Sequence, residues 1–186
     1  MKKQLASLLI IIVALVAINA AAQERSEPRY AELPNFHQVN TGLYRGAQPG
    51  EGGLQKLVSL GIKTVINLRD DDEREQSEER EAKAAGLRYF NIPLSNSSAP
   101  SDAQVERILA LINAQENQPV FVHCKRGADR TGTIIAVYRI SHDGWMSERA
   151  KTEAKHYGMG FWQVGMKDYI SDYYKKQNRL RSRAGA

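Results

Sequence analysis

Runs of apolar residues, separated by polar and glycine-rich stretches, predict an alternation of short strands and helices. Runs rich in apolar and β-branched residues predict strands over Ile62–Leu68, Leu87–Leu94 and Pro119–His123, of which the last is expected to be central and buried. Residues 36–48 alternate loosely around two glycines and predict two further short strands joined by a turn. Helical spacing predicts helices over residues 53–61, 133–141 and 147–157, one that opens with a capping box at Ser101, and a last one through Met166–Tyr173. Charge pairs such as Glu79–Lys83 predict an exposed helix over residues 72–86.

This order of elements predicts the fold class. Strands that alternate with helices imply an α/β protein with a mostly parallel central sheet and helices on both faces. A chain of 186 residues suits one domain with a substantial core better than two domains. Because ligands of such sheets bind at the carboxyl ends of the strands, we expect the functional site just after Pro119–His123.

The first 22 residues predict an export signal. Lys2 and Lys3 precede an uncharged run over residues 4–23, which contains the small residues Ala20–Ala22 near its end. This pattern is typical of a secretory signal peptide over residues 1–22, and indicates an exported protein, periplasmic or secreted. The run is also just long enough to span a bilayer, so without cleavage it would be an N-terminal membrane anchor.

Shifts in composition mark the expected limits of the folded domain. Residues 23–34 are polar, contain two prolines and predict a linker. The domain is expected over residues 35–178, followed by a basic tail over residues 179–186. We expect this tail to be a solvated, frayed helix end, although its cations also suit contact with an anionic lipid surface close to a membrane.

Charge and cysteine content exclude some classes of function. Without Lys2 and Lys3, 24 basic residues remain against 21 acidic ones, and a net charge of +3 is too mild to predict nucleic-acid binding. The single cysteine, Cys124, has no second cysteine to pair with, so a structural disulfide within the chain is excluded. We expect a monomer.

The stretch Val120–Gly132, which reads VFVHCKRGADRTG, organises the rest of the chain. It predicts a buried strand, a tight glycine-bearing loop and a helix that begins near Arg130. Such a loop directs backbone N–H groups and a helix N-terminus toward one point, where an anion binds. The same field favours the thiolate of Cys124, and the planar fork of Arg130 suits two oxygens of a phosphate. These residues predict a phosphate-ester hydrolase that works through a cysteinyl-phosphate intermediate.

The segment His123–Gly132, HCKRGADRTG, resembles the HCxxGxxR[ST]G signature of the cysteine-dependent protein tyrosine phosphatase superfamily. It is most similar to the compact dual-specificity phosphatases, including the atypical plant-and-fungal type and exported bacterial forms. The resemblance implies Cys124 as nucleophile, Arg130 as the transition-state cation and His123 as a support for loop geometry. Thr131 is expected to donate a hydrogen bond to the sulfur of Cys124. No metal and no cofactor are expected, because Arg130 and the loop supply the positive field.

The phosphate cradle is expected to comprise Lys125, Arg126, Gly127, Ala128, Asp129 and Arg130. The segment Tyr44–Pro49 is similar to Tyr-Arg-Gly/Ser-x-Gln-Pro segments that approach the active loop in bacterial phosphatases of this type. Arg45 is therefore a candidate cation of the outer pocket, with an ordinary solvated turn arginine as the alternative.

The general acid departs from the family pattern, which places an aspartate on a separate upstream loop. Here the residues Ser95–Ala99 contain Asn96 but no carboxylate. We favour Asp129, inside the loop, as the general acid, with Asp102 as the alternative and the acidic run Asp70–Asp72 behind both. This run is interpreted as a solvated helix start rather than a metal site, since no histidine accompanies it.

The basic loop residues Lys125 and Arg126 leave several substrates open. Superfamily members with basic loops often act on inositol phosphates or phosphoinositides, and proteins phosphorylated on tyrosine, serine or threonine are the other class. Two other functions remain as alternatives: a catalytically weak, phosphate-dependent binding module, and a rhodanese-like sulfur transferase. The intact Cys124 and Arg130 count against the first, and the Arg130–Gly132 ending counts against the second.

Overall fold

The central strand of the sheet is β5 (Val120–Cys124), which carries the cysteine at its carboxyl end. The computed structural model describes residues 29–184, so the predicted signal peptide lies outside the described part of the chain. The other strands are β1 (His37–Asn40), β2 (Leu43–Ala47), β3 (Thr64–Asn67) and β4 (Arg88–Asn91). The helices are α2 (Gly53–Ser59), α3 (Glu73–Ala84), α4 (Asp102–Asn113), α5 (Asp129–Ser141), α6 (Ser147–His156) and α7 (Val164–Ala184), with a 3₁₀ turn η1 (Gln115–Asn117) before β5.

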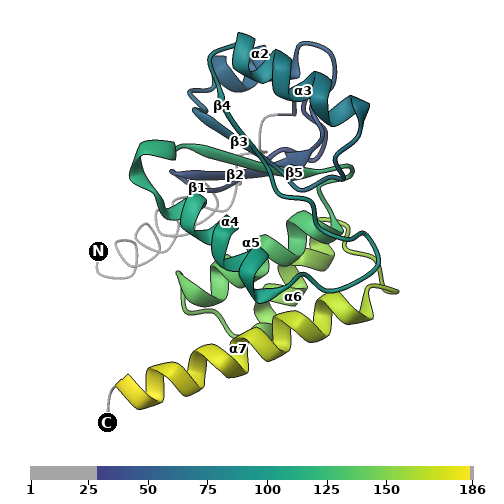
Figure 1. Ribbon diagram of the computed structural model, residues 1–186. Coiled ribbons are helices and arrows are strands. Elements are labelled where there is room, and N and C mark those ends of the chain that lie inside the picture. The colour runs from purple at the N-terminus through teal and green to yellow at the C-terminus, as the bar shows by residue number, and fades with distance from the viewer. Residues whose placement is uncertain (1–28, 185–186) are drawn as a thin grey trace, which may run out of the picture.

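The sheet has the strand order β1-β2-β5-β3-β4. Only β1 runs antiparallel to its neighbour, and the other pairs are parallel. Helices α2 and α3 cover one face of the sheet, and α4 to α7 cover the other (Figure 1). The predicted fold class, a single α/β domain with a mostly parallel sheet between helices, is therefore confirmed.

Two apolar clusters hold these layers together, and β5 contributes to both because successive side chains of a strand point to opposite faces. Phe121 packs with Leu57 and Val65 beneath α2 and α3. Val120 and Val122 pack with the residues of α4 and α5 on the other face. Burial on both faces is what the apolar run Val120–Val122 of β5 predicts.

The structure corrects the expectation of an exposed helix over residues 72–86. Three residues of α3 are buried, namely Glu75, Glu78 and Ala82. Burial raises the pKa of Glu75, and its effect exceeds that of a hydrogen bond from Tyr89, which lowers it. The helix covers the sheet with two carboxylates on its inner side, and charge pattern alone did not predict this.

Both limits of the domain also differ from those expected. Leu33 is 2% exposed and packs beneath α2, and the carbonyl of Pro34 accepts a 2.8 Å hydrogen bond from Ala47. The end of the expected linker therefore belongs to the folded domain. At the other end, α7 continues through the expected tail to Ala184, where Arg181 donates to the carbonyl of Ile140 at the end of α5. None of the helices between residues 29 and 184 is long and apolar enough to cross a membrane.

Candidate active site

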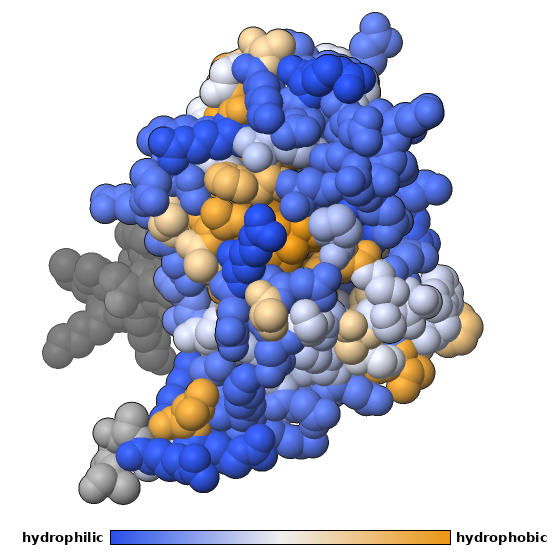
Figure 2. Space-filling model, in the orientation of Figure 1, coloured by the Kyte–Doolittle hydropathy of each residue, from blue (hydrophilic) through white to orange (hydrophobic). Residues whose placement is uncertain are grey.

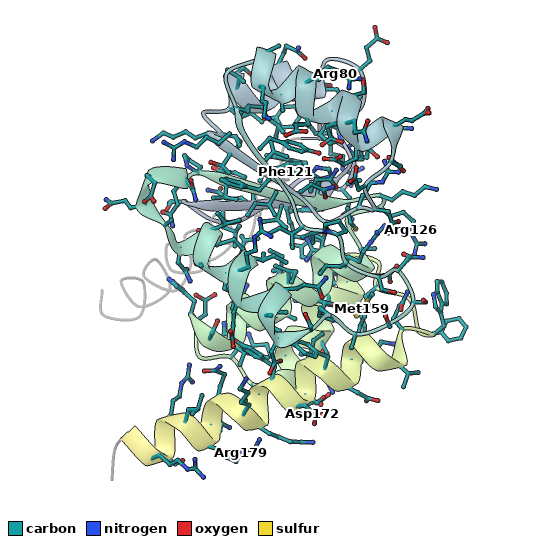
Figure 3. All side chains as sticks on the ribbon, viewed as in Figure 1. Arg80, Phe121, Arg126, Met159, Asp172 and Arg179 are labelled. Atoms are coloured by element: carbon teal, nitrogen blue, oxygen red, sulfur yellow. The ribbon has the colours of Figure 1, made fainter. Side chains whose placement is uncertain are left out.

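A tight loop joins β5 to α5 and lies at the carboxyl edge of the sheet. Gly127 has a φ of 68°, and a Cβ at this position would lie 2.4 Å from the carbonyl of Gly46 at the end of β2. No side chain fits there, so the loop passes over its neighbouring strand only because residue 127 is glycine. Figure 3 shows Arg126 at this edge, above Met159, which packs on the side of the sheet that α4 to α7 cover.

Two side chains hold the carbonyls of the loop. Asn35 donates from Nδ2 to the carbonyl of Arg126 over 3.0 Å, and Arg45 donates from Nη2 to the carbonyl of Gly127 over 2.8 Å. In a planar trans peptide the N–H of the next residue points away from the carbonyl. The N–H groups of Gly127 and Ala128 therefore point away from these two anchors. With the N-terminus of α5 this is the geometry of an anion cradle.

Arg45 lies beneath the loop, so the expectation of an outer-pocket cation is wrong. Its side chain is 1% exposed, and its guanidinium lies 4.3 Å from the ring centroid of Tyr157. The position follows from the register, since Arg45 of β2 pairs with Val122 of β5 two residues before the cysteine. Burial lowers the pKa of Arg45 to about 10, and the opposing charges of Glu153, Tyr157 and Cys124 offset part of that effect.

Arg130 lies at the other end of the loop, in the first turn of α5, and is 4% exposed. Its Nη1 donates to the carbonyls of Leu68 and Leu94, each over 3.3 Å. These carbonyls follow the ends of β3 and β4. The sheet thus fixes the guanidinium at the edge where Cys124 ends β5.

The three candidate acids occupy different surroundings. Asp129 is 3% exposed, and both of its oxygens are engaged: Oδ1 accepts the N–H of Gly160 over 2.8 Å, and Oδ2 accepts Arg126 over 2.5 Å. Asp102 begins α4 and accepts hydrogen bonds from Lys176 and Tyr169 of α7, each over 2.8 Å. The hydrogen bond from Lys176 is the largest of the effects that lower the pKa of Asp102.

The acidic run after β3 approaches the active loop through its first member. Asp70 Oδ2 lies 3.6 Å from Nη1 of Arg130, and the Asp70 side chain is 73% exposed. Asp72 instead caps α3 by accepting the N–H of Glu75. This cap confirms that the run starts a helix. Within residues 29–184 no group of three or more His, Cys, Asp or Glu side chains is placed to hold a metal ion.

His123 lies on the α3 face of the sheet and is fully buried. Its ring stacks on Phe121, and its Nε2 lies 2.7 Å from Oε1 of Glu78, at an angle outside the range of a hydrogen bond. Glu78 accepts a hydrogen bond from Gln48, and Arg69 also bonds Gln48. Neither ring nitrogen of His123 has a hydrogen-bond partner among the described residues, so its role in supporting the loop stays a prediction.

The expected hydrogen bond of Thr131 is not formed. Its hydroxyl is buried and has no hydrogen-bond partner among the described residues, which include Cys124. The hydroxyl of Thr133 donates to the carbonyl of Asp129, four residues earlier in α5, over 2.9 Å.

Several residues at the site were not anticipated from the sequence. Asn35 has a φ of 54° and bonds both Arg126 and Tyr157. Glu78 cannot be told apart by sequence from the other acidic residues of its helix. Gly160 fixes Asp129 from the segment between α6 and α7, where its neighbourhood carries no familiar motif.

Comparison with known proteins shows the family to which the chain belongs. Residues 24–172 match the family described as a DSP-PTPase phosphatase fused to NAD+ kinase. The dual specificity protein phosphatase TpbA of Pseudomonas aeruginosa (strain PAO1) is 34% identical over 127 residues, which are 68% of this chain and 56% of that protein. Inositol diphosphatase DSP1 of Oryza sativa subsp. japonica is 30% identical over 109 residues, which are 56% of this chain and 49% of that protein. The chain thus spans about half the length of the curated relatives it matches.

A solved structure extends the likeness over most of the chain. The crystal structure of P. aeruginosa TpbA in complex with pTyr superimposes with a TM-score of 0.66 at 25% identity, and covers 83% of this chain and 98% of that one. The family match, the fold and the strand–loop–helix with its cysteine and arginine agree. The chain belongs to the compact, cysteine-based dual-specificity phosphatases of the DSP-PTPase family.

Proposed function

We propose that this protein hydrolyses phosphomonoesters through a cysteinyl-phosphate intermediate. The observation that carries the proposal is the position of Cys124 and Arg130 at the two ends of one loop. Asn35 and Arg45 bind the carbonyls of this loop, so that its N–H groups are free to face an anion. The thiolate of Cys124 attacks phosphorus, the P–O bond to the leaving group breaks, and a proton goes to the departing oxygen. Arg130 and the loop N–H groups stabilise the charge on the equatorial oxygens. Water then cleaves the S–P bond, which releases inorganic phosphate and restores the thiolate.

Asp70 is the proton donor in this proposal. Asp129 and Asp102 are each held by two donors, whereas Asp70 is the exposed carboxyl group beside Arg130. From this position its carboxyl group can reach the oxygen that leaves a phosphate bound by Arg130, which is the place of a general acid. This assignment replaces our preference for Asp129, which instead holds the loop to Gly160.

The substrates that fit best are inositol phosphates or phosphoinositides. Lys125 and Arg126 are exposed at the mouth of the loop, where additional phosphates of such a substrate would lie. The inositol diphosphatase among the relatives supports this class. Phosphorylated proteins are the second class, because TpbA is named as a dual specificity protein phosphatase. The uncharged segment after Lys2 and Lys3 supports export of the protein, so either substrate would be met outside the cytoplasm.

A phosphate-release assay on residues 23–186 tests the proposal. The panel comprises inositol polyphosphates, phosphoinositides, tyrosine-phosphorylated peptides and p-nitrophenyl phosphate. Replacing Lys125 and Arg126 with Ala should reduce turnover of multiply phosphorylated substrates far more than that of p-nitrophenyl phosphate. Equal losses on both would show that these cations only tune the loop. Sulfite release from thiosulfate would instead identify a sulfur transferase, and phosphate binding without any release would identify a binding module.

A further inference from the structure

Large apolar side chains are exposed together at one place in the fold, just after α6. Phe161 is 84% exposed, Trp162 56% and Val164 60%, and we call these three residues the aromatic tip. The other large hydrophobic residues exposed within residues 29–184 are scattered, at Val58, Met146 and Leu180. A contiguous exposed apolar group of this kind is typical of an interaction surface.

The aromatic tip is held in place rather than free. A Cβ at Gly160 would lie 2.5 Å from the ring of Trp162, so this ring packs directly on the Gly160 backbone. Gln163, between the exposed residues, is buried and donates to the carbonyl of Asn96 over 3.0 Å. Lys167 donates to the carbonyl of Phe161 over 2.8 Å. The tip is therefore pre-organised, and its apolar side chains remain exposed.

The same contacts place the aromatic tip beside the active loop. Gly160, which lies next to Phe161, donates its N–H to Asp129 of the loop. Asp129 in turn binds Arg126, and Lys125 and Arg126 are exposed. Pale and orange side chains gather over the start of α7 in Figure 2, and Figure 3 shows Arg126 along the same edge. Exposed aromatics and exposed cations thus share the edge that holds Cys124.

We infer that the aromatic tip docks the enzyme on an anionic membrane surface. Aromatic side chains favour the interface between lipid headgroups and acyl chains, and nearby cations are attracted to anionic headgroups. Side chains as exposed as Phe161 and Val164 protrude without walls, whereas peptide recognition needs a groove with pockets for alternate side chains. Docking would bring the active loop against phosphorylated headgroups, so the inference deepens the proposed function and names its lipid substrates.

The basic end of α7 is not part of this surface. In Figure 1 the helix begins near the active edge and runs away from it to the opposite side of the molecule. The cations of the expected tail therefore lie far from the aromatic tip. Leu180, on this distant part of α7 and 49% exposed, is a matched control for an exposed apolar residue.

The test uses the fluorescence of Trp162 in residues 23–186, which lack the apolar N-terminal run that would itself bind lipid. The protein has two tryptophans, so Trp145→Phe makes Trp162 the only one. Phosphatidylcholine vesicles containing phosphatidylglycerol should shift its emission to the blue and sediment the protein, and pure phosphatidylcholine vesicles should do neither. Phe161→Ser with Val164→Ser should weaken sedimentation by roughly tenfold or more, with p-nitrophenyl phosphate turnover unchanged. Leu180→Ser should sediment like the parent.

The inference is overturned if anionic vesicles leave the emission unchanged, or if Leu180→Ser weakens sedimentation as much as the double variant. A shift produced by a tyrosine-phosphorylated peptide and not by vesicles would overturn it in favour of a peptide-docking surface. Failure of the proposed function is distinguishable, because Cys124→Ser should bind vesicles like the parent. If the parent bound vesicles but released no phosphate from any substrate, the docking inference would stand and the proposed phosphatase function would be excluded.

Discussion

Asp70 and Arg130 meet at the mouth of the active loop, with 3.6 Å between Oδ2 and Nη1. The two residues come from different parts of the fold. Asp70 follows β3, and Arg130 lies in the first turn of α5, which follows β5. Because β3 pairs with β5, the carboxyl ends of both strands lie at one edge. The ion pair links the arginine proposed to bind phosphate to the carboxyl group proposed to donate a proton.

Replacing Asp70 with Asn should slow the hydrolysis of aryl phosphates that have poor leaving groups by about a hundredfold. Hydrolysis of esters with good leaving groups should be nearly unchanged, because only poor leaving groups need a proton donor. Turnover across a series of aryl phosphates of rising leaving-group pKa gives the measurement. The matched control is Asp71→Asn, next in the same exposed run. An equal loss on every ester in the Asp70 variant would rule out its role as general acid.

Asp129→Ala should act on the loop and not on proton transfer. The variant removes the acceptor of the buried Gly160 N–H, so the free energy of unfolding should fall by about 1–3 kcal/mol. Turnover should fall by the same factor for good and poor leaving groups. Denaturant unfolding and the same ester series check both expectations, with Asp168→Ala on the exposed surface of α7 as control. Loss confined to the poor leaving groups would restore Asp129 as the acid.

Arg45→Met should weaken phosphate binding and turnover, because it removes the 2.8 Å hydrogen bond that holds the carbonyl of Gly127 and so orients the loop. Two of its donors, Nε and Nη1, have no hydrogen-bond partner among the described residues, so the variant also removes two unpaired buried groups and should still fold. The affinity for inorganic phosphate and the turnover of p-nitrophenyl phosphate measure the effect. Arg88→Met, on the edge strand β4, is the control. Parental affinity and turnover in Arg45→Met would show that the loop does not depend on this contact.

The contact between Asp102 and Lys176 should contribute stability but not activity. The folded state holds the pKa of Asp102 below its ordinary value, so the contact stabilises at a pH above that value and is lost as the pH falls through the folded value. Asp102→Asn should therefore lower the thermal midpoint at neutral pH and make little difference in acid. Turnover should be unchanged. A selective loss on poor leaving groups would instead make Asp102 the proton donor.

The sequence predicted the strand–loop–helix that carries the candidate nucleophile and arginine, because this motif is local. Cys124 and Arg130 lie within one strand–loop–helix, and the apolar run before Cys124 needs two buried faces, which a central parallel strand provides. The capping box of Ser101 and Gln104 is equally local and was found as predicted.

The parts that sequence did not predict depend on contacts between distant segments. Arg45 reads as a turn residue until the pairing of β2 with β5 places it beneath the loop. Asp129 is not free to act as an acid because its Oδ1 accepts the N–H of Gly160, a residue 31 positions later in the chain. Glu78 faces inward because the position of α3 on the sheet, not the charge pattern of the helix, decides which side is buried.

Phosphate release by Cys124→Ser tests the central claim most directly. A serine hydroxyl is hardly ionised where a thiol is, so the variant should lose turnover of p-nitrophenyl phosphate and of inositol phosphates. It should still fold and bind inorganic phosphate, since Arg130 and the loop N–H groups remain. The measurement is initial rates for parent and variant at equal concentration, with unfolding curves for both. Turnover by Cys124→Ser close to that of the parent would contradict the cysteinyl-phosphate mechanism.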